Sequence, residues 1–375
     1  MIRKVELNNF KSHSQTQLVF SNLTVLCGAN GVGKSSALQV LLLLRESFLK
    51  SKFEYLDFKS NPVSIGTAKD ALYQFSDKDE ICFNISTDNQ DLEFVFEIKD
   101  FTKTMIRKSK HIFDLEKLDL EPLFSKTFQF ISAARLGPQL SYPKDDVVVD
   151  VYNQISVIEG KAEHFIHFLQ RKKDNEVISE LCLPNIKTTD LFSQVTAWER
   201  EISSGVNVIV QDIGNLGYEL KYQFNTNSDK GRTNEFKASN VGFGLSYVMP
   251  VIVAILSAPK DAIIFIENPE AHLHPYGQAK LAELICKASQ AGIQIVVETH
   301  SDHIINGILV QCKNVEESGV GISKNHVSIY HFTRDEEKHC TNAERVKIEE
   351  GGCIRYAPKG FFDQFTIDRK RLMGF

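Results

Sequence analysis

Residues 28–35, near the N-terminus, have the composition and spacing of a loop that binds phosphate groups. They read GANGVGKS and fit the pattern G-x-x-x-x-G-K-S. Glycines let the backbone curl so that N–H groups of the loop and of the following helix point at one phosphate cluster. The lysine adds positive charge for the β- and γ-phosphates, and the serine hydroxyl is a ligand for Mg²⁺.

The flanks of this loop support the same interpretation. Residues 23–27 form an apolar run and residues 36–41 have helix-forming composition, which is the strand–loop–helix context that the motif needs. We therefore expect a nucleoside triphosphate and Mg²⁺ to bind here. No N-K-x-D guanine-reading motif occurs, which argues against a GTPase, and no H-R-D or D-F-G element occurs, which argues against a kinase. The predicted ligands of the nucleotide in this region are Asn30, Gly31, Gly33, Lys34, Ser35 and Ser36.

A second group of polar residues follows the apolar run 262–266, which reads as a strand buried on both faces. In open α/β sheets, ligands bind outside the carboxyl ends of the strands. We therefore expect Glu267, directly after the run, to hold Mg²⁺ together with Ser35. The next position, often a glutamate that activates water, is Asn268, which cannot accept a proton. Glu270 is the nearest replacement for that base.

Two further segments carry candidate site residues. His300 follows the predicted strand 293–297, where it is suited to contact the γ-phosphate and the attacking water. Residues 239–246, SNVGFGLS, precede an apolar helix and suit a signature loop that reaches a phosphate through N–H groups and a hydroxyl; the alternative is a tight turn that opens a packed helix. The signature candidates are Ser239, Gly242 and Gly244. A transition-metal site is the alternative use of the histidine-rich residues Glu270, His272, His274, His300 and His303.

The elements that must position these residues alternate between strand and helix patterns. A strand, a helix near 278–290 and another strand predict a parallel, doubly wound core. Alternating apolar residues predict antiparallel pairs at the N-terminus and a hairpin of 82–85 with 92–98. Helical spacing is predicted for 162–183 and 190–202, and further strands for 206–210, 218–222, 329–332, 346–348 and 353–356. The expected organisation is an ATPase head in two parts, 1–140 and 206–375, with a helical insertion or lid at 141–205.

Composition narrows the class of protein. The chain has 375 residues, of which 42% are hydrophobic and 24% charged, as in a globular protein with a sizeable core. Its net charge of -5 gives no general attraction to nucleic acid. The seven cysteines are scattered without a C-x-x-C pair, which argues against a zinc ribbon or a disulfide framework. The expected location is cytoplasmic, since no apolar run has the length of a membrane span and the N-terminus lacks a signal peptide.

Several motifs resemble the ABC-type ATPase heads shared by SMC proteins, related DNA-repair ATPases and the OLD family. Residues 9–13, NFKSH, are similar to the N-F-[KR]-S motif that precedes the Walker A loop of those heads. The segments IENPEAHLHP (266–275) and ETHSDH (298–303) are closest to small OLD-like ATPases, many of them from bacterial anti-phage operons. The GFFDQF segment (360–365) also resembles that subgroup. The signature region is a looser match and lacks L-S-G-G-Q.

The resemblance implies an α/β P-loop NTPase fold of the ABC/SMC head type, with mixed and parallel sheets plus the helical insertion. It also implies that two protomers clamp two ATP molecules, with the signature loop of one completing the phosphate site of the other. Lys11 would then lie near the nucleotide. Gln139 would be the Q-loop residue that links the metal to the insertion, although Arg135 and Gln129 fit nearly as well.

The function that this resemblance favours is an ATP-hydrolysing dimeric switch that regulates a separately encoded effector, a nuclease or toxin, in anti-phage defence. The chain has room only for a compact insertion rather than coiled-coil arms, and no nuclease centre of its own is expected. Two alternatives stay open. One is a DNA-repair or DNA-maintenance ATPase that binds DNA, and the other is a nucleotide-gated scaffold with little turnover, which Asn268 in place of a glutamate would suit.

Overall fold

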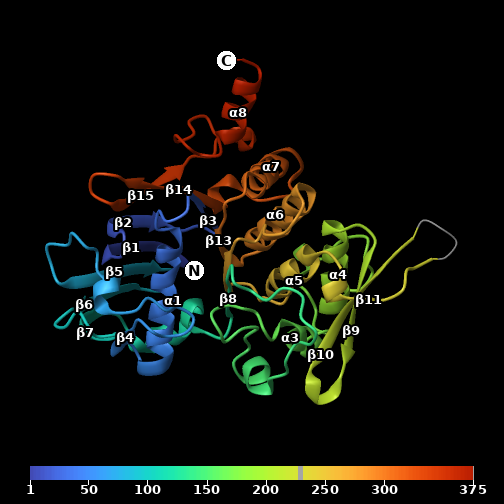
Figure 1. Ribbon diagram of the computed structural model, residues 1–375, viewed down its shortest axis with the longest axis horizontal. Helices are drawn as coiled ribbons and strands as arrows, with labels where there is room; N and C mark the ends of the chain where they lie inside the picture. The colour runs from blue at the N-terminus through green and yellow to red at the C-terminus, as the bar shows by residue number, and fades with distance from the viewer. Residues whose placement is uncertain (227–230, 375) are drawn as a thin grey trace.

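The strands of the chain form three sheets, two of six strands and one of three, in the computed structural model, which describes residues 1–226 and 231–374 (Figure 1). The central sheet has the order β15-β14-β3-β13-β12-β8, and its neighbouring strands run parallel except at the β14–β15 edge. In that order its strands are Cys340–Val346, Val327–Asp335, Leu23–Gly28, Gln294–Glu298, Ile263–Glu267 and Phe128–Ile131. The predicted α/β fold with a parallel, doubly wound core is confirmed.

The second six-stranded sheet is antiparallel throughout and has the order β2-β1-β5-β6-β7-β4. In that order its strands are His13–Val19, Ile2–Phe10, Glu80–Thr87, Asp91–Glu97, Met105–Ile112 and Tyr55–Asp57. It contains both antiparallel pairs that the sequence predicts, β1 with β2 and β5 with β6. The third sheet consists of β9 (Val206–Asp212), β10 (Tyr218–Phe224) and β11 (Phe236–Lys237).

Both faces of the central sheet are covered, which explains why its strands are apolar at nearly every position. Along β12, Ile264 and Ile266 pack into one hydrophobic cluster, whereas Ile263 and Phe265 pack into another. The first cluster includes α5 (Phe243–Leu256), α6 (Pro275–Gln290) and α7 (Asp302–Ser318). The second includes α1 (Lys34–Ser51), the short α2 (Ala68–Ala71) and the antiparallel sheet. Helix α1 therefore packs with both large sheets.

The segment after β8 is less helical than its sequence pattern predicts. Helix α3 covers only Phe165–Arg171, and α4 covers Leu191–Ile202 as expected. The longer helix predicted over 162–183 is wrong, because the polar stretch 172–175 turns instead: the N–H of Asn175 donates to the carbonyl of Lys172. The three-part division of the chain stays a prediction. Among the described residues, no helix is long and apolar enough to cross a membrane.

The C-terminal segment leaves the central sheet after β15. The predicted strand at 329–332 lies within β14, whereas 346–348 contributes only its first residue to β15. No strand forms at 353–356, because Gly351 and Gly352 take positive φ values of 71° and 66° and turn the chain away from the sheet edge. The chain ends in α8 (Gln364–Leu372), which projects from the body of the protein beyond α7 (Figure 1).

Candidate nucleotide-binding site

The phosphate-binding loop, residues 28–35, joins the end of β3 to the start of α1 and is packed tightly from behind. A Cβ on Gly28 would lie 2.3 Å from the carbonyl oxygen of Phe332, and one on Gly33 would lie 2.3 Å from Oγ1 of Thr341. Both glycines have positive φ, 132° and 104°. Helix α1 has no side-chain cap at its first turn. Its free N–H groups are therefore available to an anion.

A cavity of about 410 Å³ lies at this loop. Its lining residues come from the turn between β1 and β2, the loop, α1, the tip of β13 and the end of β14. They are Lys11, Ser12, Asn30, Gly31, Gly33, Lys34, Ser35, Ser36, Gln39, Glu298, His300 and Arg334. The structure thus brings together eight of the predicted site residues. Ser12, Gln39, Glu298 and Arg334 are lining residues that the sequence reasoning did not select.

Two lysines bring positive charge into this cavity. The Nζ atom of Lys34 donates to the carbonyl oxygens of Gly28 (3.1 Å) and Ala29 (2.6 Å), and it lies 4.0 Å from Oε1 of Glu298. The Nζ atom of Lys11 donates to Oε1 of Gln39 at 2.9 Å. Burial lowers the pKa of both lysines, which means that the protein alone solvates their charge poorly. Phosphate oxygens would supply the missing negative charge.

Two neighbouring strands of the central sheet end in carboxylates, and one of these carboxylates contacts Ser35. Glu267 on β12 and Glu298 on β13 are register partners in a parallel pair, so they sit side by side at the carboxyl edge of the sheet. The Ser35 hydroxyl donates to Oε1 of Glu298 at 2.8 Å, and the N–H of Ala133 donates to Oε2 of Glu267 at 3.0 Å. Glu298 follows its apolar strand as directly as Glu267 follows its own. That signal could have selected it from sequence.

The chemistry of this donor set fits Mg²⁺. Oε2 of Glu298 is buried and has no hydrogen-bond partner among the described residues. Its pKa is raised to about 7, first by burial and then by the negative charges of Glu267 and Glu270. Burial also raises the pKa of Glu267. Mg²⁺ takes oxygen ligands from one or two carboxylates, water and phosphates. Ser35, Glu298 and Glu267 would hold such an ion, which would neutralise their charge and that of a bound phosphate.

This environment predicts a pH-dependent stability effect of Glu298. Its folded pKa of about 7 lies above the ordinary value of 4.5, so its protonation favours the folded state and that contribution is lost as the pH rises through 7. As the pH rises from about 5 to about 8, we expect the free energy of unfolding of the parent to fall by about 2 to 3 kcal/mol relative to that of Glu298→Gln. Urea denaturation of both proteins without nucleotide or Mg²⁺ measures this difference. A difference that is constant with pH would contradict the prediction.

Glu270 and Asn268 connect the tips of β12 and β13. Oε1 of Glu270 accepts the backbone N–H of His300 at 2.9 Å, and its Oε2 atom is buried without a partner in the described part of the chain. The N–H of Asn268 donates to the carbonyl oxygen of Glu298 at 2.8 Å, with Asn268 at a φ of 44°. The pKa of His300 is lowered by burial and by the charge of Lys34, which keeps its imidazole neutral at pH 7. A carboxylate and a neutral imidazole therefore lie next to the acid that would hold the metal.

The three candidates for the residue between the metal and the insertion differ in their contacts. The Arg135 guanidinium donates to the carbonyl oxygens of Glu267 and Asn268, both at 2.8 Å, and lies over the Tyr247 ring. The Gln129 amide instead holds the backbone of residues 153–155. Of the three, only Arg135 contacts the acidic strand tip.

Gln139, the predicted Q-loop and metal residue, does not line the loop cavity. The chain turns after Arg135, where the N–H of Leu136 donates to the carbonyl of Lys161 and that of Gln139 to the Tyr142 hydroxyl. These bonds carry Gln139 toward the segment that follows. Gln139 is therefore not among the described residues that line this cavity, and neither are Glu267, Asn268 and Glu270, the predicted residues at the tip of β12.

The signature candidates lie at the start of α5, which packs on the other face of the central sheet from α1. Gly242 is the N-cap of α5 and a Cβ there would meet nothing within 4 Å, whereas a Cβ on Gly244 would lie 2.5 Å from the carbonyl oxygen of His272. Close packing against the His272 backbone thus explains why position 244 is a glycine without any contact to a phosphate. None of Ser239, Gly242 and Gly244 lines the loop cavity of the same chain.

The alternative transition-metal site is not assembled. Within residues 1–226 and 231–374, no group of three or more histidine, cysteine, aspartate and glutamate side chains could hold a metal ion. His272 instead packs its ring against Phe243 and Tyr247, and His274 caps the first turn of α6.

The fold and the site together define an ATPase of the P-loop class with the head fold of SMC proteins. An SMC head solved with the C-winged helix domain of ScpA is 15% identical, with a TM-score of 0.54 over 92% of this chain and 98% of that chain. An SMC head with an extended coiled coil, bound to the C-terminal domain of ScpA derived from Pyrococcus furiosus, is 13% identical, with a TM-score of 0.52 over 99% of both chains.

Comparison of the sequence with known families assigns the chain to a narrower group than the fold does. Residues 23–306 match the family described as "AAA domain, putative AbiEii toxin, Type IV TA system", so the chain belongs to that family. Residues 322–372 match a second family, described as a protein of unknown function, DUF3696. No curated protein matches the sequence.

Proposed function

We propose that this protein is an ATP-hydrolysing switch that closes as a homodimer on bound ATP and Mg²⁺ and regulates a separately encoded effector. The observation that carries the proposal is the meeting, at one edge of the central sheet, of the Lys34 ammonium, the Ser35 hydroxyl and the carboxylates that end β12 and β13. A cation, a hydroxyl and paired carboxylates at a helix N-terminus are the groups that a magnesium–triphosphate needs.

The roles of the individual groups follow from their positions. Lys34 and the N–H groups of the phosphate-binding loop bind and orient the phosphates, and Ser35 with Glu298 and Glu267 holds Mg²⁺. Glu270, the carboxylate next to His300, accepts the proton of the attacking water. Neutral His300 positions that water and contacts the γ-phosphate.

A second protomer would bring the start of α5 to the nucleotide. The loop cavity is not lined by the predicted signature residues of its own chain, and a Cβ on Gly242 would meet nothing within 4 Å. The adjoining Phe243 side chain is 46% exposed, so it is accessible to a second protomer. In the proposed dimer, Ser239, Gly242 and Gly244 of each protomer complete the phosphate site of the other.

Control of a separate effector is supported by the relatives and by the chain's surface. The name of the family points to toxin–antitoxin systems, and both SMC heads were solved with a domain of another protein, ScpA, bound. In this chain, Val147, Val151 and Tyr152 in the segment after β8 are each about half exposed. We infer that residues 141–205 act as the lid that transmits dimer closure to the effector. A role in anti-phage defence, like that of OLD-like ATPases, is part of this proposal.

Nucleotide-dependent dimerisation tests the proposal directly. We expect Glu270→Gln with ATP and Mg²⁺ to sediment as a dimer in analytical ultracentrifugation, because bound ATP is then not hydrolysed. The parent without nucleotide should sediment as a smaller species. Gly242→Trp, which fills the open space at the start of α5, should remain monomeric with ATP, although the phosphate-binding loop of each chain still binds the nucleotide. A Glu270→Gln protein whose oligomeric state is unchanged by ATP would contradict the dimeric switch.

A further inference from the structure

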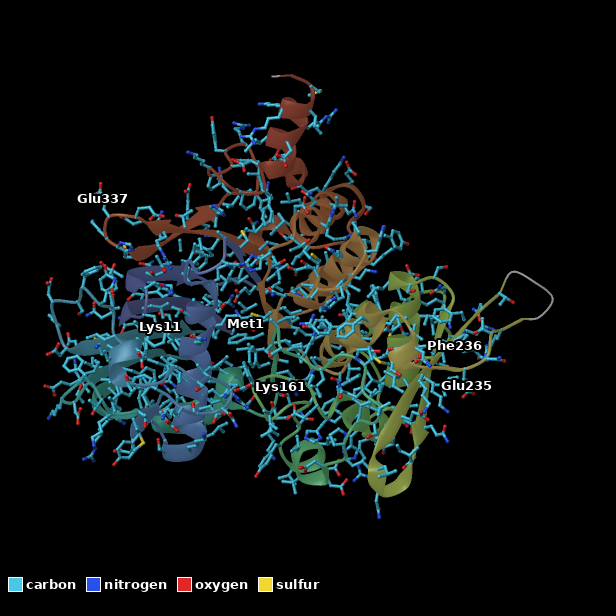
Figure 2. All side chains as sticks on the ribbon, in the orientation of Figure 1. Met1, Lys11, Lys161, Glu235, Phe236 and Glu337 are labelled. Carbon is cyan, nitrogen blue, oxygen red and sulfur yellow. The ribbon has the colours of Figure 1, made fainter. Side chains whose placement is uncertain are left out.

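A hairpin near the C-terminus packs directly behind the phosphate-binding loop. It consists of β14 and β15, which pair antiparallel from Ile329 to Asp335, and Figure 2 shows Glu337 at its far end. β14 also runs beside β3, with Phe332 paired to Gly28 at the start of the loop. The hairpin belongs to the stretch that matches the second family and lies outside the stretch that matches the first.

Three consecutive carbonyl groups of the loop are held by side chains from outside it. The Arg334 guanidinium donates to the carbonyl oxygen of Gly31. The Thr341 hydroxyl donates to that of Val32 at 2.9 Å, and Nε2 of His13 pairs with that of Gly33 at 3.0 Å. Because the carbonyls are fixed on the outer side of the loop, its N–H groups are turned toward the cavity.

Arg334 differs from the other two residues because it also lines the cavity itself. It is exposed, and the Gly31 carbonyl is the only partner of its guanidinium among the described residues. A guanidinium has five N–H donors, so most of them are free for another acceptor. Arg334 lies at the end of β14 and is placed over the phosphate-binding loop of its own protomer.

The charges around the cavity are unbalanced without an anion. Lys11, Lys34 and Arg334 each donate to uncharged oxygens, those of Gln39, of Gly28 and Ala29, and of Gly31. Glu298 is the only carboxylate that lines the cavity within the described part of the chain. Three cations that hold neutral acceptors around one cavity form a site for a group with several negative charges.

We propose that Arg334 is a phosphate-binding residue of the nucleotide site, supplied by the β14–β15 hairpin of the same chain, and that Thr341 positions the loop for it. The proposal rests on the proposed nucleotide site and adds a ligand to it. The guanidinium leaves the Gly31 carbonyl, or shares its donors with it, and forms charge-assisted hydrogen bonds to phosphate oxygens. A planar fork of donors suits the oxygens of a phosphate chain better than a ribose hydroxyl or a base.

The test compares nucleotide binding by three variants in isothermal titration calorimetry. We expect Arg334→Gln to bind ATP about 10- to 100-fold more weakly than the parent, since a charge-assisted hydrogen bond is lost, and Arg334→Lys to lie in between. Lys338→Gln removes the same charge from an exposed position in the turn of the same hairpin and should bind ATP as the parent does. Circular dichroism and thermal unfolding establish that all three are folded.

The number of phosphates on the ligand distinguishes the possible outcomes. If Arg334 binds the phosphate chain, Arg334→Gln should lose much of its affinity for ATP and little of its affinity for AMP. An Arg334→Gln protein that binds ATP like the parent, or that loses AMP and ATP affinity equally, would overturn the assignment. If Lys34→Ala also binds ATP like the parent, the nucleotide site itself is wrong, and the failure belongs to the proposed function instead.

Thr341 is tested through rescue by a conservative variant. Thr341→Val keeps the shape of the side chain and removes the hydroxyl that holds Val32 and pairs with the Ser12 hydroxyl at 2.7 Å. ATP affinity should fall in Thr341→Val and return to the parent value in Thr341→Ser. Equal losses in both variants would show that Thr341 acts through packing alone.

Discussion

Lys34→Ala is expected to abolish measurable ATP binding. In the structure its ammonium donates to the carbonyls of Gly28 and Ala29 in the loop before the N-terminus of α1, and its side chain is only 3% exposed. An alanine removes the charge that is placed nearest to the phosphates, and it leaves Glu298 without its neighbouring cation. Two or more charge-assisted hydrogen bonds are lost, so affinity should fall by at least about 100-fold. Calorimetry or a fluorescent ATP analogue measures it.

The matched control for this change lies on the same helix. Lys50, in the last turn of α1, pairs with Glu46 at 3.2 Å and does not line the loop cavity. Lys50→Ala removes the same charge and the same side chain from α1, so ATP affinity should stay at the parent value. ATP binding that survives Lys34→Ala would mean that residues 28–35 form a tight turn before a core helix and no nucleotide site.

Glu270→Gln is expected to lower the rate of ATP hydrolysis by about 10²- to 10⁴-fold, the usual contribution of a general base, while ATP still binds. Asn268 cannot accept a proton, and its N–H is already bonded to the carbonyl of Glu298. The carboxylate of Glu270 is held by the backbone N–H of His300 through one oxygen, which leaves the other free. A glutamine keeps that hydrogen bond but cannot take the proton of water.

Phosphate release under conditions that saturate the enzyme with ATP checks this prediction. Glu317→Gln on α7, at the exposed pair with Lys313, is the control for the loss of one carboxylate and should hydrolyse ATP at the parent rate. Equal turnover of Glu270→Gln and the parent would assign the base elsewhere. A parent that binds ATP without releasing phosphate would instead favour the nucleotide-gated scaffold.

Much of the candidate site could be predicted because it is encoded locally. The phosphate-binding loop is one contiguous stretch in which the glycines, the lysine and the serine stand at the spacing that phosphate binding needs. The strands before Glu267 and His300 carry apolar residues on both faces, so their parallel arrangement and the position of their tips follow from the pattern. The helix predicted over 162–183 was wrong because its polar residues suit either a helix surface or a turn. The conformation that such residues adopt depends on their tertiary contacts rather than on the local sequence.

The amino-acid sequence by itself determined the phosphate-binding loop, the strand–helix–strand core and the acid at one strand tip, Glu267, because each of these is a property of contiguous residues. Only the tertiary structure decided that Glu298 lies beside Ser35, that Gln139 does not line the cavity, and that the β14–β15 hairpin places Arg334 over the loop. The physical reason is the strand order. β14 pairs with β3 although some three hundred residues separate them, and no local pattern along the chain specifies that neighbour.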